Sequence, residues 1–137
     1  MIKVAVRVRP FLPDEIANTL CVDIPSETQL VIKDMEGNSD KTFEYNHCLW
    51  SFDGFDLSKQ GTRKAKPGVD GYASQEDVWE CLGRPALELA ISGENANVVA
   101  YGYGDSGKSF SMFGHGSDKG LIPHACEEVF EWIDDSY

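Results

Sequence analysis

The feature that most constrains this chain is an eight-residue stretch, Gly102 to Ser109, which reads GYGDSGKS. It matches the pattern G-x-x-x-x-G-K-[ST], in which a glycine-rich loop wraps backbone N–H groups around phosphate oxygens. A short apolar, β-prone run, Val98 to Tyr101, precedes the loop, and a helical segment follows it. Strand, loop and helix is the order that a phosphate site requires, because the helix presents its positive end to the same anion. The pattern therefore predicts an α/β fold that binds phosphate.

The motif also assigns roles inside the loop. Lys108 would reach the β- and γ-phosphates of a nucleotide, and the Ser109 hydroxyl would ligate Mg²⁺. These two are the expected catalytic residues, and Ser109 is the expected metal ligand. We expect phosphate to lie against the whole loop, which consists of Gly102, Tyr103, Gly104, Asp105, Ser106, Gly107, Lys108 and Ser109. The alternative is a glycine-rich turn that binds nothing.

Length and charge narrow the function further. The chain has 137 residues and a formal net charge of −11, which predicts one domain at most. The acidic balance argues against a non-specific nucleic-acid binder and against a polybasic membrane patch, because both need clustered Lys and Arg. No apolar run is long enough to cross a bilayer, and the N-terminus is too charged for a signal peptide. The four cysteines form no CxxC pair, so we expect reduced thiols in a cytoplasmic protein without structural zinc.

The first half of the chain predicts short strands. Lys3 to Arg9 alternates at the period of a strand. Further strands are expected over Leu20 to Ile24, Gln29 to Lys33 and Thr42 to Phe52, with a turn at 36–40. Residues 55–71 predict a surface loop, in which the basic residues Lys59, Arg63, Lys64 and Lys66 would be solvated rather than in contact with a partner.

Two helices are predicted in the second half. One begins at Ser74, a good N-cap with Asp77 completing a capping box, and ends at Gly93. Gly83 and Pro85 should weaken or kink it. The last helix begins near Pro123, and its apolar stripe consists of Cys126, Val129, Phe130 and Ile133. The three tryptophans, Trp50, Trp79 and Trp132, are expected to pack inside.

Five segments in this order resemble a kinesin motor domain, most closely of the kinesin-3 type. They are Lys3 to Phe11 with its R-x-R-P signature, Lys41 to Asp53, Tyr72 to Trp79, Asn97 to Gly114, and Gly120 to Ile133. The resemblance implies the P-loop NTPase fold of a kinesin head, a mixed sheet flanked by helices, which is incomplete in this chain. Residues 1–137 would be the N-terminal portion of the motor domain, from its first strand through the helix after the phosphate loop.

The resemblance also implies ligands and partners. A kinesin binds ATP with Mg²⁺ and is a microtubule-stimulated ATPase of the cytoskeleton, and its microtubule contacts would lie mostly beyond this chain. Arg7, Arg9 and Pro10 would border the adenine, and Phe110 would lie against the base. For Phe110 the alternative is a core residue, and for the two arginines a solvated strand end. The segment His115 to Lys119 would form a surface loop at the mouth of the nucleotide pocket.

Two departures from the family pattern favour a second interpretation. Kinesins usually carry Gln-Thr where this chain has Tyr103 and Gly104, and a small neutral residue where Asp105 stands. A carboxylate at about 5 Å from phosphate, at an effective dielectric of about 20, repels it by roughly 3 kcal/mol. The other departure is that neither switch I, an N-x-x-S-S-R-S-H run, nor switch II, a D-x-x-G motif, is expected in this sequence, so both would have to follow Tyr137.

Three interpretations follow. The chain is part of an ATP-driven microtubule motor, or it is a truncated or degenerate kinesin-like protein that binds nucleotide weakly or not at all and has no motor activity. The third is an unrelated P-loop kinase or GTPase, against which the R-x-R-P strand and the order of the motifs argue.

Overall fold

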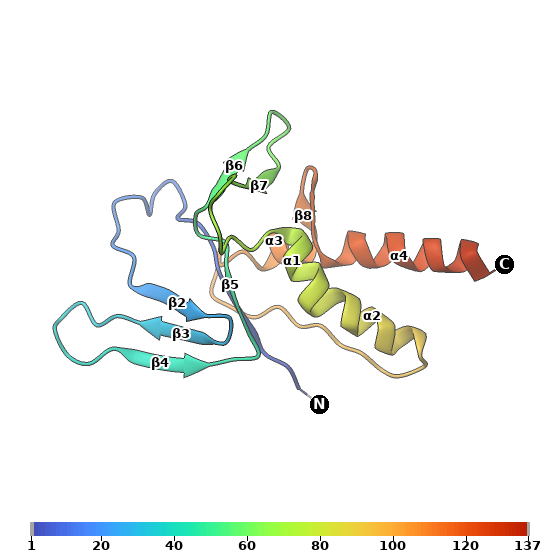
Figure 1. Cartoon of the computed structure of the whole chain (residues 1–137), viewed down its shortest axis with the longest axis horizontal. Helices are drawn as coiled ribbons and strands as arrows, with labels where there is room; N and C mark the ends of the chain where they lie inside the picture. Colours follow the sequence, from blue (N-terminus) through green and yellow to red (C-terminus); the bar gives the residue numbers. More distant parts are fainter. Residues whose placement is uncertain (1, 137) are drawn as a thin grey trace. The chain divides into compact units, whose positions relative to one another are not determined.

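The computed structural model describes residues 2–136 and divides into two compact units (Figure 1). The first unit contains the residues up to Gly54 together with Val69–Tyr72. The second contains Phe55–Gly68 and the residues from Ala73 onward. Each unit has its own strands and buried residues and is described by itself.

Among the described residues of the first unit, the regular elements are all strands. A parallel pair joins β1 (Ala5–Val8) to β5 (His47–Trp50), and a separate antiparallel sheet has the order β2-β3-β4. Its strands are β2 (Val22–Ser26), β3 (Gln29–Ile32) and β4 (Lys41–Glu44). The buried side chains include Leu30, Cys48 and Ser51. The predicted strands at 3–9, 20–24 and 29–33 are thereby confirmed, with their ends shifted by a few residues.

The single strand predicted over 42–52 is wrong, because two strands occupy that range. β4 ends at Glu44, and Asn46 then breaks the run. The backbone N–H of Asn46 donates to the Val4 carbonyl at 2.9 Å, and its side-chain oxygen accepts from the Val4 N–H at 2.8 Å. This exchange ends pairing with β3 and starts pairing with β1, so β5 joins a different sheet. The turn predicted at 36–40 is confirmed between β3 and β4. Residues 34–37 read D-M-E-G, so the expectation that no D-x-x-G match occurs in this sequence is wrong, and the match lies at this turn.

Over its described residues, the second unit combines two hairpins with five helical segments, four α-helical and one π-helical. The first hairpin pairs β6 (Phe55–Leu57) with β7 (Arg63–Ala65), and the second pairs β8 (Gly114–His115) with β9 (Asp118–Lys119). The segment predicted as a surface loop at 55–71 is mostly exposed, as expected, but it contains this first hairpin. Ser58 closes the first hairpin, because its N–H donates to the Thr62 carbonyl at 2.9 Å and its hydroxyl accepts from the Thr62 N–H at 3.1 Å.

The predicted helix from Ser74 exists, but its middle is not α-helical. It runs through α1 (Gln75–Val78), a π-helical segment η1 (Trp79–Gly83) and α2 (Arg84–Ile91). The capping box is present, with the Asp77 N–H on the Ser74 hydroxyl at 3.2 Å and the Ser74 N–H on the Asp77 carboxylate at 2.7 Å. Gly93 ends the helix at φ +92°. The disturbance predicted at Gly83 and Pro85 takes the form of the wider π turn.

The core of this unit is built around Trp79, which is 1% exposed. Its indole N–H donates to Glu128 at 2.9 Å, and its ring stacks on His124 with centroids 5.4 Å apart. Both partners lie on α4 (Leu121–Ser136), which begins two residues before Pro123. The first turns of α4 therefore pack against η1.

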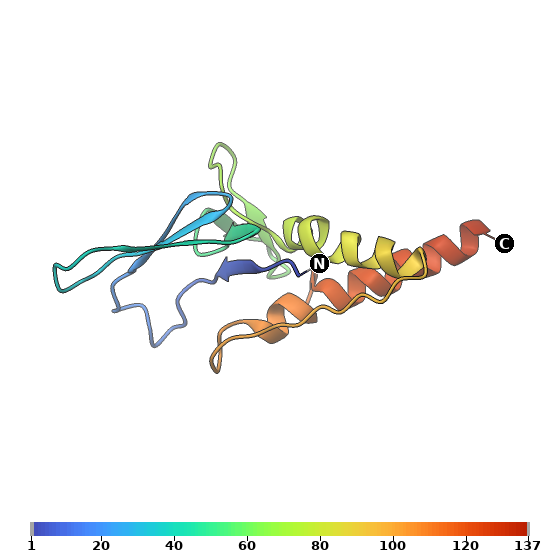
Figure 2. The same ribbon diagram turned by 90° about the horizontal axis from the view of Figure 1, so that it is seen from below.

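The apolar stripe predicted for the last helix is largely exposed over the described residues. Cys126 is exposed, Phe130 is 67% exposed, and Trp132, expected to pack inside, is 49% exposed. α4 contacts η1, α3 (Lys108–Met112) and β9 and then runs on past them (Figures 1 and 2). An amphipathic pattern marks a face that is able to pack, and it does so only where another element lies opposite. In residues 2–136, no helix is long and apolar enough to cross a membrane.

The strand predicted over Val98 to Tyr101 is also wrong in the described structure. These residues form no ladder with any other described residue, and Val99 and Tyr101 are 83% and 99% exposed. β-prone residues become a strand only when a neighbouring strand takes up their N–H and C=O groups.

Candidate nucleotide site

The phosphate loop has a backbone that its glycines make possible. Gly102 lies at φ +154° and Gly107 at φ +92°. A Cβ on Gly102 would lie 2.5 Å from the Ser106 hydroxyl, so no larger residue fits there without a shift. The Ser106 N–H donates to the Tyr103 carbonyl at 3.2 Å and closes a turn inside the loop. The predicted loop is thus a folded, closed bend that leads directly into α3.

Lys108 holds the two sides of this bend together. Its ammonium donates to the carbonyls of Gly102 at 2.9 Å and Tyr103 at 2.7 Å, and lies 3.5 Å from the Ser106 hydroxyl. Lys108, the residue predicted to bind phosphate, therefore donates its hydrogen bonds to oxygen atoms of its own loop. An anion would replace neutral carbonyls with charged oxygens, which form stronger hydrogen bonds with an ammonium.

Asp105 lies at the crest of the loop in an unusual conformation. Its φ is +57°, the one positive value of a non-glycine residue within the described part of the chain, and its side chain is exposed. Asp tolerates the left-handed region better than most residues, but at some cost relative to glycine. The structure thus places a strained, charged residue in the bend where a small neutral one would fit more easily.

Ser109 offers a single oxygen to a cation. It is exposed in the first turn of α3, next to Lys108. No group of three His, Cys, Asp or Glu residues that could hold a metal ion occurs between residues 2 and 136. A hydroxyl is a suitable ligand for Mg²⁺, which usually completes its shell with water and phosphate oxygens rather than with a protein cage. The donor set fits a cation that arrives with a nucleotide.

Phe110 is held on two sides. Its carbonyl accepts from the side-chain amide of Gln75 at 2.7 Å, and Gln75 is 8% exposed. Its ring lies under the guanidinium of Arg63, whose carbon is 4.8 Å from the ring centroid. The sequence predicted neither partner. In the sequence, Gln75 follows a predicted helix cap and Arg63 lies in a segment predicted to be a solvated loop. No spacing links either residue to Phe110.

Arg63 is itself anchored at a buried carboxylate. Asp118 is 5% exposed and accepts from the Arg63 backbone N–H at 3.0 and 3.1 Å and from its guanidinium at 3.4 Å. The region predicted as a surface loop, 115–119, is therefore a tight hairpin that turns an acidic side chain inward.

The residues predicted to border the adenine lie in the first unit. The Arg7 guanidinium donates to the Ser51 hydroxyl at 2.9 Å. Arg9 donates to both oxygens of Glu15, at 2.6 and 2.8 Å, and to the Pro10 carbonyl at 2.7 Å. The hydrogen bonds from Arg9 to its carboxylate, with one from the Leu12 N–H, lower the pKa of Glu15 to about 2. Contact of Arg7, Arg9 and Pro10 with a base stays a prediction.

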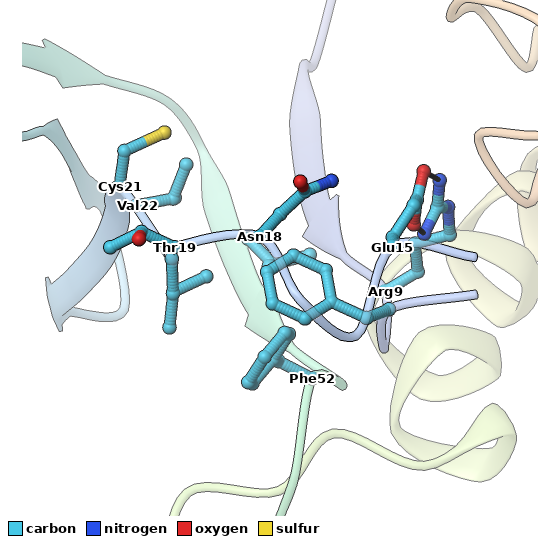
Figure 3. A pocket seen from close by; sticks show the side chains of 10 residues that line it. Arg9, Glu15, Asn18, Thr19, Cys21, Val22 and Phe52 are labelled. Atoms are coloured by element: carbon cyan, nitrogen blue, oxygen red, sulfur yellow. Dashed lines mark hydrogen bonds and ion pairs between the residues drawn. The ribbon is translucent and has the colours of Figure 1, made fainter. Parts of the chain in front are cut away.

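Arg9 and Glu15 also line a cavity of about 320 Å³ in the first unit (Figure 3). Phe11 and Phe52 form its apolar wall, with ring centroids 4.9 Å apart at 89°. The Arg9 charge is already matched by Glu15, so this ion pair fixes the loop after β1 rather than offering a free cation.

A profile of the kinesin motor domain matches residues 7–137. The chain belongs to the kinesin family. It is 39% identical over 135 residues to the kinesin-like protein KIF28 of Rattus norvegicus, covering 97% of this chain and 13% of that protein. It is 41% identical over 140 residues to KIF13A of Homo sapiens, covering 96% of this chain and 7% of that protein.

Solved kinesin structures confirm the fold. The motor segment 391–755 of KIF14, with ADP and in complex with a microtubule, matches all of this chain with a TM-score of 0.83 at 33% identity. A two-heads-bound KIF14 dimer with AMP-PNP, also in complex with a microtubule, matches 98% with a TM-score of 0.80. The predicted kinesin P-loop NTPase fold is therefore correct. This kinesin chain spans about a third of the KIF14 chains, 35% and 34%, and a smaller share of the curated relatives.

Proposed function

We propose that this chain is the nucleotide-binding portion of a kinesin motor and that residues 102–109 hold Mg-ATP. The observation that carries the proposal is the bend closed by Lys108, whose ammonium lies on the Gly102 and Tyr103 carbonyls at 2.9 and 2.7 Å. A flexible ammonium on neutral acceptors is free to exchange them for phosphate oxygens. The ADP and AMP-PNP named for the KIF14 structures are consistent with this ligand class.

Each predicted residue has a separate task in this proposal. Lys108 binds the β- and γ-phosphates, and Ser109 supplies one oxygen to Mg²⁺. When bound, Mg²⁺ neutralises charge that develops on the phosphates. Phe110 meets the base, and contact of Arg7, Arg9 and Pro10 with a base stays a prediction.

Hydrolysis and movement belong to the whole motor in this proposal. The KIF14 chains that match are complexes with a microtubule, and this chain spans about a third of their length. We assign microtubule-stimulated ATPase activity, microtubule binding and a cytoskeletal location to the complete protein, and nucleotide capture to the part described.

A second candidate is a kinesin-like protein in which nucleotide binding has decayed. The observation that favours it is Asp105, a carboxylate in the left-handed region at the crest of the loop. The residue opposes phosphate electrostatically and costs more there than glycine would. In this case the domain serves as an interaction module.

Titration calorimetry with Mg-ATP separates the two candidates. We expect saturable binding to the 137-residue chain, and at least about tenfold weaker binding for Lys108→Ala, because a charge-assisted contact of about 1.5–3 kcal/mol is lost. Lys64→Ala, which removes an exposed hairpin lysine, is the matched control and should bind like the wild type. The first candidate would be refuted if no binding is detected at millimolar Mg-ATP, or if Lys108→Ala binds Mg-ATP with the affinity of the wild type. Binding that appears only in Asp105→Gly would support the second.

A further inference from the structure

We propose that Arg63, anchored at Asp118, is a positioning residue that holds the Phe110 ring for the nucleotide base. The proposal rests on the proposed function, since it takes Phe110 as the residue that meets the base. It assigns a role to the β6–β7 hairpin, which the sequence presented as a solvated loop.

The first step is the anchor. Asp118 is a carboxylate with 5% exposure, and its hydrogen bonds to Arg63 come from both the backbone N–H and the guanidinium. A buried charge needs such partners, because burial without them is strongly unfavourable. Gly114 lets the β8–β9 hairpin close, since a Cβ there would lie 1.9 Å from the Asp118 carbonyl oxygen. The carboxylate that holds Arg63 is therefore itself fixed.

The second step is the placement of the guanidinium. Its carbon lies 4.8 Å from the centroid of the Phe110 ring and 5.6 Å from that of Phe55. The buried Nε of Arg63 has no hydrogen-bond acceptor among the described residues. A side chain held only for its hydrogen bonds would not leave a buried donor unused. The conformation is instead explained by contact with the aromatic rings, which attract a planar cation.

The third step connects the ring to the phosphate loop. Phe110 directly follows Lys108 and Ser109 in α3, and its carbonyl is held by Gln75 at 2.7 Å. Gln75 fixes the backbone of this residue while Arg63 fixes the ring. A base that contacts Phe110 would therefore meet a preorganised surface, which lowers the entropy cost of binding.

The fourth step is the consequence for selectivity. Phosphate contacts depend on the loop backbone and Lys108, whereas base contacts depend on the Phe110 ring. Loss of Arg63 should loosen the ring and leave the loop intact. The affinity for ATP should then fall, while the affinity for tripolyphosphate, which has no base, should not.

The experiment compares Mg-ATP with magnesium tripolyphosphate by calorimetry on the full chain. For Arg63→Leu we expect the ratio of the ATP affinity to the tripolyphosphate affinity to fall by about 3- to 10-fold, as expected for the loss of a cation–π contact. The change should come from weaker ATP binding, with tripolyphosphate binding unchanged. Arg63→Lys keeps a cation and should recover part of the ratio. Lys64→Leu, the neighbouring exposed position on the same hairpin, is the matched control and should leave the ratio unchanged.

A second variant keeps the proposal testable if Arg63→Leu does not fold. Asp118→Asn retains an oxygen that accepts from the Arg63 N–H, and it should lower the ratio in the same direction by a smaller factor. If the ratio of the ATP affinity to the tripolyphosphate affinity is unchanged in the folded variants, or if both affinities fall equally, the role of Arg63 is refuted and the proposed function is not. A wild-type chain that binds neither ligand would overturn the proposed function and this inference with it.

Discussion

Gly83→Ala should destabilise the second unit, although helix propensity predicts the opposite. In an ordinary helix, replacing glycine with alanine stabilises by about 1 kcal/mol. At this position a Cβ would lie 2.0 and 2.3 Å from Cε3 and Cζ3 of Trp79 and 3.0 Å from Cδ2 of Leu121. The Trp79 ring is 1% exposed and is held by its bond to Glu128 and its stacking on His124, so it has nowhere to move.

The magnitude follows from these opposing effects. Overpacking of a filled core costs about 1–3 kcal/mol. If the indole N–H leaves its carboxylate, about 1.5–3 kcal/mol more is lost. After the propensity gain, we expect a net loss of about 2 kcal/mol, which for a chain of this size lowers Tm by about 7 °C.

Thermal unfolding followed by far-UV circular dichroism measures the effect. The decisive control is the same substitution in a Trp79→Phe background, where the atoms that clash are removed. There Gly83→Ala should be neutral or stabilising. A Tm at or above the wild type for the single variant would refute the reasoning, and so would an equal loss in both backgrounds.

Three further predictions concern single side chains. Asp105→Gly should tighten Mg-ATP binding by about tenfold at low salt and by less at high salt, because roughly 1–3 kcal/mol of screened repulsion is removed; calorimetry that finds equal affinities contradicts it. Since the pKa of Glu15 is lowered to about 2 from 4.5, its bond to Arg9 stabilises fully above pH 4.5 and is lost as the pH falls towards 2. Glu15→Gln should therefore be less stable than the wild type at pH 6 and equal to it near pH 2 in urea unfolding, and a gap that does not change with pH would argue against the ion pair. Gln75→Ala should lower the stability by about 1 kcal/mol, because the Phe110 carbonyl loses a buried donor, and an unchanged urea midpoint would contradict this.

The sequence predicted the features that local chemistry decides. Ser74 and Asp77 form the capping box because both partners lie within one turn of chain. Gly93 ends its helix for the same reason, since a left-handed residue there needs no distant partner. Gly102 and Gly107 of the phosphate loop also act locally, through φ values that other residues adopt with difficulty.

The features that the sequence could not predict depend on distant partners. The π turn at η1 brings Gly83 so close to Trp79 that a Cβ would not fit between them, and Leu89 is 46% exposed despite its helical spacing from Val78. The contacts of Arg63 with Asp118 and Phe110 depend on the β6–β7 and β8–β9 hairpins, which bring distant parts of the chain together. No periodicity or motif carries such information, because the partners lie far apart along the chain.

The run that leads into the phosphate loop has a thermodynamic consequence. Residues 98–101 enter no ladder within the described part of the chain and are exposed, so their backbone is not fixed by a neighbouring strand. Fixing a backbone residue costs about 1–2 kcal/mol of conformational entropy. If a strand paired with this run, the backbone would already be fixed before nucleotide binding, and binding would not have to offset this loss of entropy. Strand pairing and nucleotide binding would then be linked, and each would raise the affinity of the other by the same factor.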